Sequence, residues 1–175
     1  PDGSETLTVN PASATAIYDA GSNPAAASQS NNTATLNDET APTVSSVTSS
    51  TTDGTYKAED EIAVTVTFSE SVTVTGTPQL TLETGSSDAV VDYSSGSVGA
   101  TLTFNYTVAS GNTSSDLDYA STSALALNSG TINDAAGNAA TLTLPTVGGS
   151  SSLGGSKALV IDTSAPSAFT TGTVT

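Results

Sequence analysis

The sequence predicts an all-β fold, an antiparallel Greek-key β-sandwich organised as a tandem repeat. Apolar residues alternate with polar ones at a period of two, which is the pattern of a strand with one buried face. Turn residues recur between these runs, and the 175-residue chain contains no His, Cys, Met or Trp. Because 35% of the chain is hydrophobic and 5% is aromatic, we expect a core of Val, Leu, Ile and Ala between two thin layers.

The expected strands follow one another closely along the chain. The clearest are residues 62–68 and 102–108, in which every second residue is large and apolar. Shorter runs fall at 44–47, 79–82, 89–93, 124–127, 141–144 and 158–161, and turn signals at 53–54, 75–78, 95–96, 111–112, 129–130 and 137–138 separate them. No segment sustains a helical period. Seven or more short strands at this spacing predict the Greek-key sandwich.

The chain also resembles itself at two places. Residues 17–25 match residues 132–140 at an offset of 115 positions, and residues 38–42 match residues 162–166 at an offset of 124. The Gly/Ser-rich insertion at 148–155 accounts for the difference between the two offsets. We therefore expect residues 1–38 to be the C-terminal part of one repeat, 39–163 a complete repeat, and 164–175 the start of a third.

Several of these segments resemble a known kind of repeat. The segments 52–56, 62–71 and 76–82, followed by Asp116-Leu117-Asp118-Tyr119, residues 134–138 and residues 162–166, resemble landmarks of the bacterial Ig-like tandem repeat. The resemblance covers residues 39–166 and the tail before them, with Gly21-Ser22 as a departure. It implies an Ig-like sandwich in a large secreted protein of the motility-associated or adhesin-like surface type.

Composition narrows the range of functions. Without His or Cys, Ser-His and Cys-His nucleophilic machinery is impossible, and paired carboxylates are the remaining catalytic option. A small repeat rarely carries a deep cleft, so we expect no enzyme activity. The formal net charge of -15 repels nucleic acid and anionic membrane surfaces, and no stretch approaches the roughly 20 apolar residues of a membrane span.

The same charge attracts cations, and Ca²⁺ prefers carboxylate and carbonyl oxygens. In an Ig-like sandwich, Asp38 would lie at one end beside the loops that hold Glu70 and Asp134, and the other acidic loops would lie at the opposite end near Asp162. Our metal candidates are Asp116, Asp118, Asp162, Asp60, Glu59, Asp53, Asp38 and Asp134. The alternatives remain open: acids kept for solubility, Asp53-Gly54 as a plain turn, and Asp134 with Asn138 holding its own loop.

The leading hypothesis is a structural module of an extracellular bacterial surface fibre or adhesin, in which Ca²⁺ stiffens the joints between domains. One alternative is a self-assembling filament subunit that polymerises by β-strand exchange, because residues 1–38 cannot form a sandwich alone. A second alternative is a module that binds glycans or a host receptor. The expected partners are neighbouring repeats or copies of the same protein.

Overall fold

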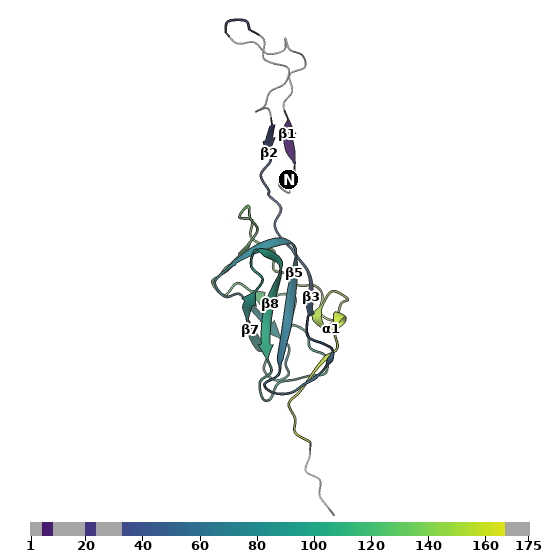
Figure 1. Cartoon of the computed structure of the whole chain (residues 1–175). Helices are drawn as coiled ribbons and strands as arrows, with labels where there is room; N and C mark the ends of the chain where they lie inside the picture. Colours follow the sequence, from purple (N-terminus) through teal and green to yellow (C-terminus); the bar gives the residue numbers. More distant parts are fainter. Residues whose placement is uncertain (1–4, 9–19, 24–32, 167–175) are drawn as a thin grey trace, which may run out of the picture. The chain divides into compact units, whose positions relative to one another are not determined.

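A computed structural model of the chain describes residues 5–8, 20–23 and 33–166, and divides it into two compact units, residues 1–40 and 41–175 (Figure 1). The described part of the first unit contains a two-stranded antiparallel sheet. Strand β1 (Thr6–Thr8) pairs with β2 (Thr33–Thr35), and the side chains of β1 are exposed. Most of the predicted repeat landmark at 17–25 lies outside the described residues.

The described part of the second unit is built from strands, with one helical turn. In chain order the elements are β3 (Val44–Ser49), β4 (Gly54–Tyr56), β5 (Glu61–Thr75), β6 (Gln79–Leu82), β7 (Ala89–Ser95), β8 (Gly99–Thr107), β9 (Thr113–Ser114), β10 (Leu125–Ala126), β11 (Thr131–Asn133), α1 (Leu153–Ser156) and β12 (Leu159–Asp162). The predicted all-β class is confirmed.

These strands form two sheets. The larger follows the order β10-β6-β7-β8-β5-β11, with β3 also paired to β5. All its pairs are antiparallel, and the long strand β5 pairs with β8 and β3 along its first half and with β11 along its last three residues. The smaller sheet has the order β4-β12-β9. Its β4–β12 pair is parallel, which departs from the wholly antiparallel expectation.

Both sheets contribute to one core. The alternating residues Ile62, Val64 and Val66 of β5 are fully buried, as the period of two predicts. They belong to one apolar cluster with Leu102 and Phe104 of β8 and with Leu159 and Ile161 of β12, a strand of the smaller sheet. Burial of this cluster is the main stabilising term of the unit.

Seven of the eight expected strand segments contain a strand. The exception is 141–144, which makes an isolated bridge between Thr141 and Thr43 but no ladder. Leu144 of that segment is nonetheless buried, and its N–H donates to the carbonyl of Thr122. The apolar alternation there reflects burial of side chains along an irregular segment that is bonded to two different neighbours.

The Gly/Ser-rich insertion covers the outer edge of β3. The N–H of Val47 in β3 donates to the carbonyl of Ser151 at 2.9 Å, and the hydroxyl of Ser156 lies 3.0 Å from that of Thr48. Leu153 of α1 is fully buried beneath this contact. An uncovered edge strand is a template for pairing with other chains, and the insertion occupies this one.

The chain enters and leaves the second unit at opposite ends (Figure 1). Just before β3, the N–H of Ser69 donates to the carbonyl of Thr43. Just after β12, the hydroxyl of Thr163 bonds to residues 111 and 112, beside the first residues of β5. The two points are separated along β5 by the span from Asp60 to Ser69, about 30 Å in an extended strand.

Candidate functional site

The loop that follows β11 is fixed by one buried carboxylate. The side chain of Asp134 is 6% exposed, and its Oδ1 accepts hydrogen bonds from the N–H groups of Gly137 and Asn138 at 2.7 and 2.8 Å. Its Oδ2 accepts from the side-chain amide of Asn138 at 2.7 Å. Gly137 adopts a φ of 98°, a conformation that favours glycine. The loop is therefore held by bonds of Asp134 to Gly137 and Asn138, the loop-holding role that the sequence offered for Asp134 with Asn138.

These bonds also keep Asp134 ionised. Burial is the largest single influence and raises the pKa, but the amide of Asn138 and the N–H groups of Asn138, Gly137 and Ala136 together lower the pKa below 3.8. A carboxylate that accepts several hydrogen bonds is stabilised in its charged form. Asp134 therefore carries a negative charge at a fixed position.

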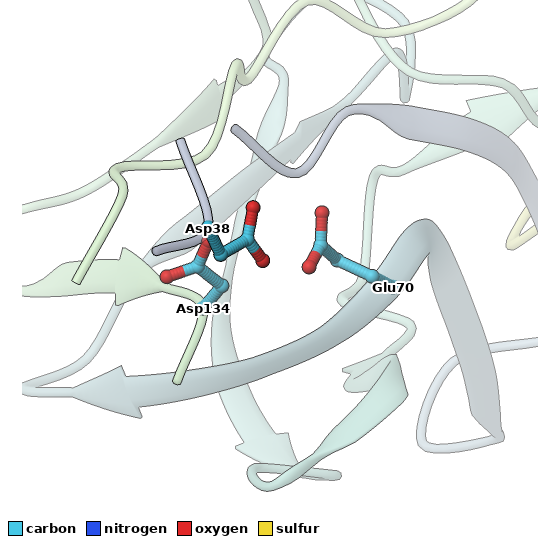
Figure 2. Close-up of side chains that lie close together, drawn as sticks. All are labelled: Asp38, Glu70 and Asp134. Atoms are coloured by element: carbon cyan, nitrogen blue, oxygen red, sulfur yellow. The ribbon is translucent and has the colours of Figure 1, made fainter. Parts of the chain in front are cut away.

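A second carboxylate lies beside Asp134. Glu70 is half-buried and stands in β5, between Thr67 and Val72, where the register with β8 shifts. Its carboxylate and that of Asp134 offer oxygen atoms within 4.8 Å of one another (Figure 2). Asp38, which is also labelled in Figure 2, belongs to the first unit.

Two of the remaining candidates are paired with lysine. Oδ1 of Asp53 lies 2.8 Å from Nζ of Lys157, and this bond lowers the pKa of Asp53, with help from the N–H of Ala158. Oδ1 of Asp60 lies 2.6 Å from Nζ of Lys57, whose side chain and backbone N–H lower the pKa of Asp60. Both lysines of the chain are therefore paired with acids.

Three further candidates lie apart. Glu59 is exposed and has a left-handed backbone with a φ of 73°, at the turn into β5. Asp116 is exposed, whereas Asp118 is 7% exposed and its Oδ2 accepts from the N–H of Gly148 at 2.9 Å. Asp116 and Asp118 therefore differ in exposure, although both were metal candidates. Asp118 instead holds the start of the Gly/Ser-rich insertion.

The last two candidates have matching local structures. Oδ1 of Asp38 accepts from the N–H of Thr40 at 2.8 Å, and Oδ1 of Asp162 accepts from the N–H of Ser164 at 2.9 Å. In each case the Asp carboxylate accepts from the backbone N–H two residues later, and Ala-Pro follows directly in the sequence. The sequence match between 38–42 and 162–166 thus extends to the hydrogen bond between the Asp side chain and the backbone.

Glu70 was not among the metal candidates derived from the sequence, although its loop was expected beside Asp38 and Asp134. One signal could have identified it: Ser69-Glu70-Ser71 interrupts the apolar alternation inside a strand that continues to Thr75. A charged residue in such a run needs solvent or a partner.

Comparison of the chain with protein-family models, with curated proteins and with solved structures found no match in any of the three. No helix among the described residues is long and apolar enough to cross a membrane.

Proposed function

We propose that this chain is a structural module of an extracellular bacterial surface fibre or adhesin, in which tandem domains supply length and rigidity. The observation that carries this proposal is the path of the chain through residues 41–166, which begins at one end of the unit and finishes at the other. A string of such units extends by the length of each domain, whereas units with adjacent termini would fold back on one another.

The terminal strands suit a load-bearing role. β3 runs inward from the point where the chain enters, and its pairs with β5 extend from Val44 to Ser49. β12 runs outward to the point where the chain leaves, between β4 and β9. Tension applied to the two ends pulls each strand along its own axis, while the ladder bonds lie across that axis. Several bonds must then break together, which raises the force required.

The Ig-like Greek-key sandwich remains our interpretation of this fold. Two features support it: two separate sheets share one apolar core, and the strand next to β5 in space, β8, lies far from it in sequence. The repeated turns at Asp38 and Asp162 support the tandem arrangement.

We also propose that Ca²⁺ binds acidic residues at the ends of the domain. Glu70 and Asp134 support this proposal because two carboxylates with oxygens within 4.8 Å offer the hard oxygen ligands that Ca²⁺ prefers, and a divalent cation between them would offset their mutual repulsion. An ion that binds only the folded state raises the unfolding temperature. Thermal unfolding of the full chain in EDTA and in millimolar Ca²⁺ measures this, and an unchanged midpoint would refute the calcium proposal.

A matched pair of variants locates the effect. Glu70→Gln removes the carboxylate beside Asp134, and Glu61→Gln makes the same change at an exposed position on the same strand. We expect Glu70→Gln to abolish the response to Ca²⁺ and Glu61→Gln to retain it. Equal responses in the two variants would place the ion elsewhere.

Stretching the full chain between its ends tests the structural role. Atomic-force spectroscopy should show one cooperative rupture whose length gain corresponds to residues 44–162, roughly 370 Å once the folded length is subtracted. Stepwise extension without a rupture peak would mean that the strands peel apart one bond at a time, and would contradict a load-bearing module.

A further inference from the structure

The ladder between β7 and β8 is incomplete, and this leaves a groove. The strands pair at Tyr93↔Phe104 and Ser95↔Thr103, with an irregular register, and the pairing goes no further. Before Tyr93, residues Ala89 to Asp92 of β7 remain paired with β6. After Phe104, β8 remains paired with β5 as far as Thr107. The two strands therefore separate like a fork, each remaining paired on its other side.

Hydrogen bonds of β6 show which way the backbone of β7 faces. Thr81, the partner of Val90, directs both its N–H and its carbonyl away from β7, to Ala124 and Ala120 at 3.0 and 3.1 Å. The pair Thr81↔Val90 is thus a non-hydrogen-bonded pair of the antiparallel ladder. The N–H and carbonyl of Val90 consequently point away from β6 and into the fork.

The same reasoning applies to β8. Ala63, the partner of Asn105, directs its N–H and carbonyl to residues 51 and 50, away from β8. Thr107 lies two positions from Asn105, so its backbone groups have the same orientation. Val108, the next residue, points the opposite way: its N–H donates to the carbonyl of Asp60, and its carbonyl accepts from the N–H of Glu59. The backbone groups of Thr107 therefore face β7, as those of Val90 face β8, and the β7–β8 ladder ends at Tyr93↔Phe104 before it reaches either residue.

The fork opens into a groove of about 640 Å³. Its walls are the two strand edges, residues 89–94 and 105–107, with Ser87, Asp88, Ala109 and Asn112 at the end. Val90 is 58% exposed, whereas the two tyrosines of the lining are less accessible: Tyr93 is half-buried and Tyr106 is 2% exposed. The groove therefore presents an aliphatic side chain and backbone more than aromatic faces. Two facing strand edges with free N–H and carbonyl groups fit an extended peptide better than a sugar ring.

Charge indicates what kind of peptide fits. Asp88 and Asp92 line the groove and no basic residue does. Both lysines of the chain are paired with Asp53 and Asp60, and the net charge is -15, so a second copy of this chain would be repelled. A segment that alternates apolar residues with Lys or Arg would complement both the acidic rim and Val90.

We propose that the groove between β7 and β8 binds an extended cationic segment of a partner protein by β-strand addition. The segment pairs with the backbone of Val90 and Thr107, and its basic side chains lie beside Asp88 and Asp92. Such a site would let the domain carry a partner along its side while the chain is extended through its ends.

Binding of the fluorescein-labelled peptide Thr-Lys-Val-Lys-Val-Lys-Thr to the full chain tests this by fluorescence anisotropy. We expect saturable binding that weakens with salt, and at least tenfold weaker binding of the same peptide with Pro at its central position. Equal binding of the Pro peptide, equal binding of a Glu-for-Lys peptide, or no binding up to millimolar concentration would overturn the proposal.

Variants place the peptide in the groove. Asp88→Lys should weaken binding severalfold more than Asp116→Lys, which makes the same charge change at an exposed site outside the groove lining. Val90→Pro removes an N–H that the β6 ladder does not use and should also weaken binding, with folding checked by circular dichroism. Equal effects of the two charge variants, competition by neutral oligosaccharides, or concentration-dependent self-association lost in Val90→Pro would each refute the proposed occupant.

Discussion

Replacing Tyr119 with Phe tests how the Gly/Ser-rich insertion is attached to the core. Tyr119 is fully buried, and its hydroxyl donates to the carbonyl of Pro145 at 2.6 Å. The neighbouring Asp118 accepts from Gly148, so these two residues hold the start of the insertion from one side. The change removes one oxygen atom and leaves the carbonyl of Pro145 without its donor.

The expected cost at neutral pH is about 1–3 kcal/mol, because a buried acceptor that loses its partner is left partly desolvated. Pro145 is only half-buried, so water can reach its carbonyl and we expect the lower half of that range. Urea unfolding at pH 8 measures the loss. The matched control is Tyr56→Phe, which removes the same group from a half-buried tyrosine that donates to the carbonyl of Thr52.

The same hydroxyl makes stability depend on alkaline pH. Burial, with a smaller contribution from the charge of Asp118, raises the pKa of Tyr119 from 10.0 to about 12. The folded state therefore resists ionisation, and the stabilisation is fully present below pH 10 and lost as the pH rises from 10 to 12. Two pKa units correspond to about 3 kcal/mol.

Tyr119→Phe should consequently be less stable than the wild type at pH 8 and should close that gap by pH 11.5. Burial also raises the pKa of Tyr106, but both proteins share that residue, so the difference between them isolates Tyr119. If Tyr119→Phe and Tyr56→Phe lose the same stability at pH 8 and follow the same alkaline curve, the reasoning from the buried hydroxyl is wrong.

Three further predictions follow from the described contacts. Hydrogen bonds hold the pKa of Asp134 below 3.8, so the stability that its carboxylate contributes is present above about pH 4 and is lost as the pH falls further. Asp134→Asn should therefore make stability depend less on pH in acid unfolding, and an unchanged acid unfolding curve would contradict this role of Asp134. Leu102→Ala should cost about 2–5 kcal/mol in urea unfolding, against about 0.5 kcal/mol or less for the exposed neighbour Thr101→Ala. Gly155→Ala places a Cβ against the carbonyl of Gly149 and should speed amide exchange at Val47, whose N–H the insertion binds; unchanged exchange would contradict the contact.

The fold class was predictable because one signal dominated the sequence. Residues 62–68 and 102–108 alternate at a period of two, and they form the paired strands β5 and β8 at the centre of the core. The same signal was misleading at 141–144, where burial of Leu144 produced alternation without a ladder. Burial sets the pattern, and hydrogen bonding decides whether a strand forms.

Short polar elements escaped prediction. β4 is Gly-Thr-Tyr and β9 is Thr-Ser, and both are too short to show an apolar alternation; they form because β12 lies between them. Helix α1 is Leu-Gly-Gly-Ser, a sequence with poor helical propensity. It owes its turn to the side chain of Ser152, which caps the N–H of Gly155, and to burial of Leu153.

For the candidate site, the sequence predicted that acidic residues gather at the ends of the domain, but it did not predict which hydrogen-bond or lysine partner each acid has. Asp134 and Asn138 were recognised from their spacing, because a short side chain can bond to the backbone a few residues later. The lysine partners of Asp53 and Asp60 differ in their distance along the sequence. Lys57 is three residues from Asp60, whereas Lys157 is far from Asp53 in sequence and meets it only in the folded chain. Only the first could be inferred from spacing.

The scarcity of basic residues has a consequence for proteolysis. Because the chain has no arginine, trypsin can cut it only after Lys57 and Lys157. The side chain of Lys57 is 76% exposed in the turn before β5, whereas that of Lys157 is 18% exposed, between α1 and β12. Cleavage after Lys57 therefore reports opening of a surface turn, and cleavage after Lys157 reports release of the segment that precedes β12. A molecule nicked at Lys157 would keep β12 paired between β4 and β9 in solution, yet its covalent continuity would already be broken.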